Sequence, residues 1–139
     1  MRYVLALVAI LGGCAIVQQP APVSAPVPVP SIGSAAVASL LDRARADVVA
    51  GRLANAAASL ERALRIEPRN PRLWQELARV RLKQGEYAQA ESVAARSNSW
   101  AGGDNRLRAE NWRLIAQARE ARGDAAGARA ALETAERQR

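Results

Sequence analysis

The order of apolar and polar positions divides the chain into three segments. Val4 to Leu11 is an unbroken apolar run that follows a single basic residue, Arg2, and ends before two glycines. Residues 18–34 then interleave prolines with small or β-branched side chains, a composition that blocks helices and favours extended polyproline II. From residue 35 onward the apolar positions recur with the period of an α-helix. The pattern therefore predicts a short apolar N-terminus, a disordered spacer and a helical domain over residues 35–139.

The helical segment repeats itself. Aligning the chain with itself at a shift of about 34 residues brings glycines and alanines into step. The recurring residues are Gly51, Gly85, Gly123, Ala56, Ala90 and Ala128. Each glycine is expected to end the first helix of a pair, because the left-handed conformation there is easiest for glycine. Pro68 is expected to break the chain before the next unit starts at Pro71, while Trp74 and Trp112 are expected to fill the space between paired helices.

This pattern resembles the tetratricopeptide repeat over about residues 37–139. The resemblance implies an all-α fold of three tandem helix-turn-helix units, at about 37–70, 71–104 and 109–139, stacked as a short right-handed solenoid. Residues 96–105 lengthen the spacing before the third unit by about four residues and predict a longer turn. The third unit ends without a separate capping helix, so its outer apolar edge is a candidate interface.

The N-terminal segment has the layout of a secretory signal peptide over residues 1–13. Its apolar stretch falls short of the ~20 residues needed to span a bilayer. Leu11-Gly12-Gly13-Cys14 resembles the lipobox of bacterial lipoproteins, in which the cysteine is acylated and becomes the N-terminus. Ala15 follows the cysteine in place of an aspartate, and within that resemblance this implies the outer membrane. An ordinary signal peptide or a short uncleaved anchor, with Cys14 unmodified, is the alternative.

Charge and reactive residues narrow the chemistry further. The formal net charge is +7, and it permits an acidic partner, an anionic membrane or nucleic acid, or reflects only an arginine-rich genome. The chain has no histidine and one cysteine, which excludes a disulfide framework, a Cys/His metal site and a histidine-based triad. No phosphate loop or nucleophile motif is present. The sequence therefore predicts no enzyme, no cofactor and no metal.

The tetratricopeptide resemblance implies a groove lined by the first helix of each unit. Its inner-face positions fall on Leu41, Arg45, Val48, Arg72, Gln75, Arg79, Leu82, Lys83, Arg113 and Gln117. The groove is expected to be basic with apolar patches, and Arg45, Arg72, Arg79, Lys83 and Arg113 are candidates to hold an acidic or C-terminal peptide. Ordinary solvated arginines are the alternative. No asparagine occupies these positions, so the family's carboxylate clamp for chaperone tails is not implied.

Trp100 lies in a Gly- and Ser-rich stretch that is expected to be a turn. Tryptophan is enriched at binding hot spots, so Trp100 is a candidate partner-binding anchor. The alternative is that its ring packs on the chain's own helices.

The whole arrangement suggests a scaffold held away from a membrane. The spacer reaches roughly 60 Å when extended. Residues 70–74 and 108–116 are similar to LpoP-type lipoproteins, tetratricopeptide-repeat activators of class A penicillin-binding proteins. That resemblance implies an outer-membrane lipoprotein that faces the periplasm, binds such a synthase and raises its activity. A generic envelope assembly factor or a pilotin-like lipoprotein for a pilus or secretion system is the alternative. Nucleic-acid binding has only the charge in its favour, and export argues against it.

Overall fold

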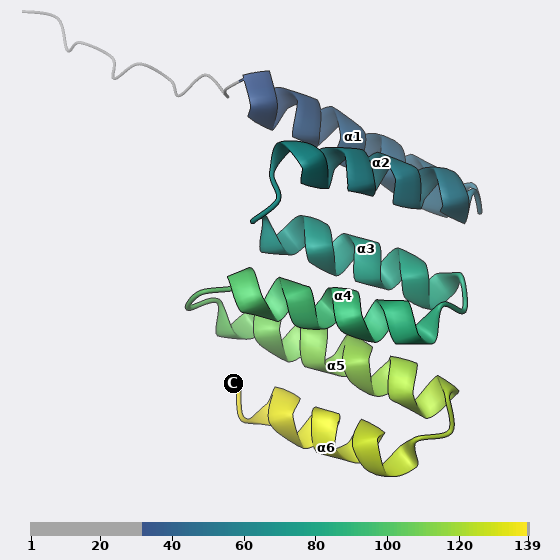
Figure 1. Cartoon of the computed structure of the whole chain (residues 1–139), viewed down its shortest axis with the longest axis vertical. Coiled ribbons are helices and arrows are strands. Elements are labelled where there is room, and N and C mark those ends of the chain that lie inside the picture. Colours follow the sequence, from purple (N-terminus) through teal and green to yellow (C-terminus); the bar gives the residue numbers. More distant parts are fainter. Residues whose placement is uncertain (1–31, 139) are drawn as a thin grey trace, which may run out of the picture.

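The computed structural model describes residues 32–138, and these residues form six α-helices joined by short turns (Figure 1). The helices are α1 (Ile32–Val49), α2 (Leu53–Ile66), α3 (Pro71–Lys83), α4 (Tyr87–Trp100), α5 (Asn105–Ala121) and α6 (Ala125–Glu136). Figure 1 shows them stacked in chain order as three helix pairs. The predicted all-α solenoid of three repeat units is confirmed. None of the helices in residues 32–138 is both long and apolar enough to cross a membrane.

The predicted signal peptide (1–13), Cys14 and the prolines of the spacer lie outside the described residues. The last residues of the predicted spacer are among the described residues. α1 begins at Ile32, inside the predicted spacer, so the helical domain starts before the expected residue 35. The reason is that Pro30 is followed by no further proline until Pro68, and nothing at Ile32 obstructs a helix.

The turn inside each helix pair depends on a glycine. Gly51, Gly85 and Gly123 have φ values of 73°, 77° and 80°, which confirms the predicted left-handed conformation. In the first turn the Gly51 amide donates to the Val48 carbonyl at 3.1 Å and the Arg52 amide to the Asp47 carbonyl at 2.8 Å. These are the two bonds of a Schellman motif, which satisfies the last carbonyls of the helix.

We expect Gly51→Ala to lower the free energy of unfolding by about 1 kcal/mol, because a β-carbon is unfavourable at positive φ. A β-carbon on Gly51 would meet no atom within 4 Å, so backbone strain alone is tested. The matched control is Gly103→Ala, where φ is not in the left-handed range and the space is also open. Urea denaturation of both variants measures the difference. Equal stabilities would show that the turn relaxes without strain.

The connections between pairs also begin and end at recognisable residues. Pro71 is the first residue of α3, as predicted, and the Asn70 side chain caps the helix by accepting from the Arg72 amide at 3.1 Å. Asp104 does the same for α5 by accepting from the Leu107 amide at 2.9 Å. The chain thus enters α3 and α5 in the same way.

The predicted longer turn before the third unit is wrong. Residues 101–104 join α4 to α5, which is the same length of turn as residues 67–70 between α2 and α3. The extra residues instead extend α5 at its N-terminus. Trp74 lies in the first turn of α3, whereas Trp112 lies a full turn further into α5. Asp104 offers a cap four residues earlier than the repeat requires, and the residues that follow it favour helix.

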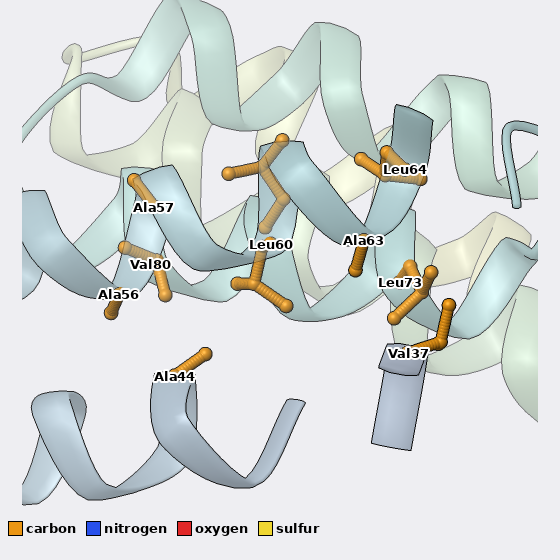
Figure 2. Packing of buried hydrophobic residues seen from close by; sticks show 10 residues of the cluster. Val37, Ala44, Ala56, Ala57, Leu60, Ala63, Leu64, Leu73 and Val80 are labelled. Atoms are coloured by element: carbon orange, nitrogen blue, oxygen red, sulfur yellow. The ribbon is translucent and has the colours of Figure 1, made fainter. Parts of the chain in front are cut away.

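The core consists of two clusters of buried side chains. The first lies among α1, α2 and α3, and Figure 2 shows its leucines and valines interleaved with alanines. The second contains residues of α3, α4, α5 and α6. Ala56, Ala63 and Ala94 are fully buried, and their small side chains let the helix backbones approach closely.

The tryptophans pack at the margins of these clusters. Trp74 packs against the first cluster and Trp112 against the second, and both are only half-buried. The Trp74 indole Nε1 donates to the Pro68 carbonyl at 2.8 Å, which holds the ring at the surface. Leu60, Leu73 and Ile115, rather than the indoles, are among the largest fully buried side chains. The expectation that tryptophan fills the inter-helix space is therefore only partly correct.

Candidate functional site

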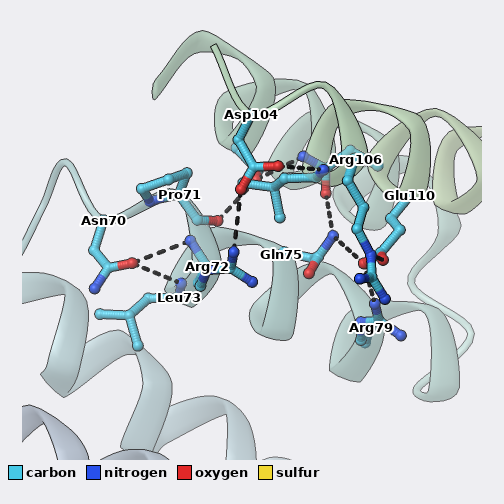
Figure 3. Close-up of polar contacts among 12 residues, drawn as sticks. Asn70, Pro71, Arg72, Leu73, Gln75, Arg79, Asp104, Arg106 and Glu110 are labelled. Atoms are coloured by element: carbon cyan, nitrogen blue, oxygen red, sulfur yellow. Dashed lines mark hydrogen bonds and ion pairs between the residues drawn. The ribbon is translucent and has the colours of Figure 1, made fainter. Parts of the chain in front are cut away.

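The predicted groove residues of the second unit face α5 across a polar hollow of about 370 Å³. Its lining residues are Arg72, Gln75, Glu76, Arg79, Asp104, Arg106, Leu107 and Glu110. Figure 3 shows Arg72, Gln75 and Arg79 projecting from α3 toward Asp104, Arg106 and Glu110 on the opposite side. The structure thus brings three of the predicted site residues, Arg72, Gln75 and Arg79, together in one place.

The charges of this polar hollow balance. Arg72 Nη2 lies 3.1 Å from Asp104 Oδ2, and Arg79 Nη2 lies 3.3 Å from Glu110 Oε2. Arg106 lies 3.3 Å from the other oxygen of the Glu110 carboxylate. Three arginines face three carboxylates, so the expected basic character is wrong for this part of the groove. The pairs are partly exposed and each contributes only about 0–1 kcal/mol, so a partner's charges could displace them at small cost.

The Gln75 side chain stabilises the fold and is hardly exposed at the surface. Its side chain is buried, with 4% exposed, and Nε2 donates to Asn111 Oδ1 at 3.1 Å and to Glu110 Oε2 at 3.3 Å. These bonds join α3 to α5. A partner that took hydrogen bonds from Gln75 would have to break them first.

The first unit contributes an apolar groove of about 210 Å³ between α1 and α3. Leu41 and Val48 line it, which agrees with the predicted apolar patch. Arg45 lies at this groove, is exposed, and forms an ion pair with Asp42 at 3.6 Å. The surface lined by α1, α3 and α5 therefore changes from apolar at the first unit to charge-balanced between the second and third.

The remaining candidate residues lie apart. Lys83 is exposed at the end of α3 and forms no ion pair within residues 32–138. Arg113 lies 3.7 Å from Glu136 of α6. Trp100 is the last residue of α4 rather than part of a turn, and the Arg69 guanidinium lies 5.2 Å from its ring centroid. The ring is 38% exposed, so it packs on its own chain through a cation–π contact and still presents a face to solvent.

Sequence reasoning missed a basic hollow at the opposite end of the solenoid. Arg43, Arg52 and Arg62 line a space of about 410 Å³ between α1 and α2, together with Asp47. Asp47 is buried and lies 2.7 Å from the Arg52 guanidinium. Three arginines and one carboxylate give this hollow an excess of positive charge, and no predicted groove position lines it. Arg43 lies on α1, Arg52 in the turn before α2 and Arg62 on α2, so the pattern of either helix alone does not reveal the hollow.

Comparison with known proteins identifies the family. The tetratricopeptide repeat model matches residues 49–109. The globular C-terminal domain of P. aeruginosa LpoP is 52% identical, with a TM-score of 0.71, and the match covers 72% of this chain and 94% of that one. The chain belongs to the LpoP-like tetratricopeptide-repeat proteins. The N-terminal domain of stress-induced protein-1 (STI-1) from C. elegans shares the fold at 13% identity, with a TM-score of 0.73 over 78% of this chain and 88% of that one. No curated protein matched the chain.

Membership of the LpoP-like family makes the described surfaces candidates for binding a protein partner. A tetratricopeptide solenoid is a protein-interaction scaffold, and its specificity depends on the side chains that its helices present. No group of three or more metal-ligating side chains lies close together within residues 32–138. The apolar groove, the polar hollow and the two edges of this LpoP-like domain are therefore its candidate partner-binding surfaces.

Proposed function

We propose that this LpoP-like protein is an outer-membrane lipoprotein that binds a class A penicillin-binding protein in the periplasm and raises its synthetic activity. The observation that carries the proposal is the 52% identity to the P. aeruginosa LpoP domain across 94% of that domain. The apolar run, the single Cys14 and the proline-rich spacer of the sequence support the membrane attachment.

A scaffold without catalytic groups raises an enzyme's rate by binding its active conformation more tightly than its inactive one. A tenfold shift toward the active state requires about 1.4 kcal/mol of differential binding. Contacts between one small repeat domain and the synthase can supply this amount. An extended spacer would reach roughly 60 Å from a lipid-modified Cys14, and this reach supports a partner in the periplasm.

The proposal is tested by adding the purified protein to a class A synthase of the same bacterium and following polymerisation of a fluorescent lipid-linked glycan precursor. We expect a saturable, several-fold rise in rate. The matched control is the STI-1 domain, which has the same fold and 13% identity, and which should leave the rate unchanged. A synthase that neither binds the protein nor responds to it would refute the proposed role.

Attachment to the membrane is tested separately. Labelled palmitate should appear on the wild-type protein in cells and not on Cys14→Ala, because the thiol of Cys14 is the proposed acceptor. The variant should also leave the outer-membrane fraction, because it lacks the acyl chains that form the proposed anchor. Label on Cys14→Ala, or no label on the wild type, contradicts lipidation at this residue.

A further inference from the structure

The end of the solenoid formed by α5 and α6 carries an open apolar groove of about 420 Å³. It is lined by Ala116, Gln117, Glu120, Ala121, Ala128 and Leu132, which we call the C-terminal edge. Leu132 is 48% exposed. No helix lies beyond α6 among residues 32–138.

The C-terminal edge repeats a groove that the first unit also has. Aligning Gly51 with Gly123 puts Leu60 of α2 in register with Leu132 of α6 and Ala44 of α1 in register with Ala116 of α5. Leu60 and Ala44 both line the apolar groove of the first unit. There, however, α3 adds Glu76 and Val80 and reduces the space to about 210 Å³. The difference between the two grooves is the helix of a following unit.

Burial of the equivalent position shows the same difference. Leu60 is 1% exposed beneath α3, and Ala94, its counterpart in the second unit, is fully buried in a cluster with residues of α5. Leu132 occupies this position in the third unit and is half exposed. A leucine at a site built to receive a helix is thus left in solvent, at a loss of about 1 kcal/mol or more of possible burial energy.

An unused charge accompanies the exposed leucine. Glu61, beside Leu60, accepts from Arg81 Nη2 of α3 at 2.5 Å. Glu133, beside Leu132, is its counterpart and forms no ion pair among the described residues. Glu120 at the same edge has none there either. The C-terminal edge and the neighbouring Glu133 therefore offer a partner helix two things. One is an apolar groove, which we call the helix seat, and the other is a carboxylate for a basic side chain.

We propose that the C-terminal edge docks an amphipathic helix of the protein partner, seated as α3 is seated on the first unit. The matching helix carries aliphatic side chains at the spacing of Leu73, Leu77 and Val80, and an arginine or lysine at the position of Arg81. The identification of the partner as a class A synthase rests on the proposed function. The proposal that the C-terminal edge binds a helix does not depend on that function.

A second copy of this chain does not fit the seat. The helix it would present is α1, in which Arg43 stands at the position of Leu77 and Asp47 at the position of Arg81. Arg43 would bring a charge into the apolar seat, and Asp47 would face Glu133 with like charge. Both residues line the basic hollow at the N-terminal edge instead. Head-to-tail stacking of two copies is therefore disfavoured.

The test uses a helix-stabilised peptide of residues 70–84, the sequence of α3, as the probe, and the full-length protein as the receptor. We expect saturable binding that Leu132→Glu weakens at least about tenfold, because a carboxylate replaces the apolar seat. The control Ala88→Glu, an exposed position of α4, should bind as the wild type does. Circular dichroism and thermal melting establish that each variant is folded and that the peptide is helical.

A charge exchange tests the proposed ion pair between Glu133 and a basic side chain of the bound helix. A peptide with Arg81→Glu should bind the wild type more weakly, and Glu133→Arg in the receptor should restore its affinity. A helical peptide that does not bind the wild type, or that binds Leu132→Glu and Ala88→Glu equally, overturns the proposed seat. A charge exchange without recovery overturns the role of Glu133.

The synthase assay separates this proposal from the proposed function. Loss of stimulation in Leu132→Glu, with stimulation retained in Ala88→Glu, supports the C-terminal edge as the contact. Stimulation that survives Leu132→Glu overturns the edge and leaves the activator role intact. A wild-type protein that binds the peptide and stimulates no class A synthase refutes the activator role and leaves the helix seat standing.

Discussion

Leu60→Ala is expected to lower the free energy of unfolding by about 3 kcal/mol. Leu60 is 1% exposed and lies in one cluster with Leu73, Leu77 and Val80 of the next unit. Truncation would leave a cavity at the junction of the first two units. The neighbouring alanines already hold the helix backbones close, so the cavity cannot collapse far. Urea denaturation would show a lower midpoint at an unchanged m-value.

The matched control for Leu60→Ala is Leu132→Ala, the same change at the equivalent position of the third unit. Leu132 is 48% exposed, so its loss should cost about 1 kcal/mol or less. The difference between the two losses in the free energy of unfolding measures how much stability a following helix adds at one repeat position. Equal losses would mean that Leu132 is covered in solution, which would also remove the open seat at the C-terminal edge.

The helix ends could be predicted from the sequence because their causes are local. Gly51, Gly85 and Gly123 adopt positive φ wherever the repeat places them, and Pro71 can only begin a helix. The position of the inserted residues could not be predicted in the same way. An insertion rich in Ser, Asn and Gly is typical of a longer turn. The Asp104 side chain, however, caps α5, and the inserted residues extend this helix at its N-terminus.

The charge of the candidate site depends on contacts that no single helix reveals. Arg72 and Asp104 are 32 residues apart, and Arg79 and Glu110 are 31 apart. The face of α3 taken alone shows Arg72 and Arg79 against the single carboxylate of Glu76, which favours a basic groove. Their acidic partners are Asp104, the N-cap residue of α5, and Glu110, which lies within α5. The expected binding roles of Arg45, Arg72, Gln75, Arg79, Lys83, Arg113 and Trp100 stay predictions.

Asn111 is the clearest case of a residue whose importance the sequence hides. Aligning Trp74 with Trp112 puts Asn111 in register with Leu73, a core position of the second unit. Its side chain is fully buried and donates to Ser97 Oγ at 2.7 Å and to Asn98 Oδ1 at 2.9 Å, while it accepts from Gln75 at 3.1 Å. Ser97 Oγ in turn donates to the Pro71 carbonyl at 2.7 Å. Hydrogen bonds thus join α3, α4 and α5 where the previous junction uses leucine.

Asn111→Ala is expected to lower the free energy of unfolding by about 3 kcal/mol, because it leaves a small cavity and removes three hydrogen bonds, two of them buried. Asn55→Ala, an exposed asparagine of α2, should change stability by less than about 0.5 kcal/mol. Asn111→Leu combined with Ser97→Ala copies the Leu73 and Ala63 pair of the earlier junction, and it should recover most of the loss. Replacing both partners of a buried polar pair by apolar groups of similar shape is often nearly neutral. Urea denaturation of the wild type and the three variants measures these differences: a loss below about 1 kcal/mol in Asn111→Ala would show that the buried network is not what holds the second and third units together.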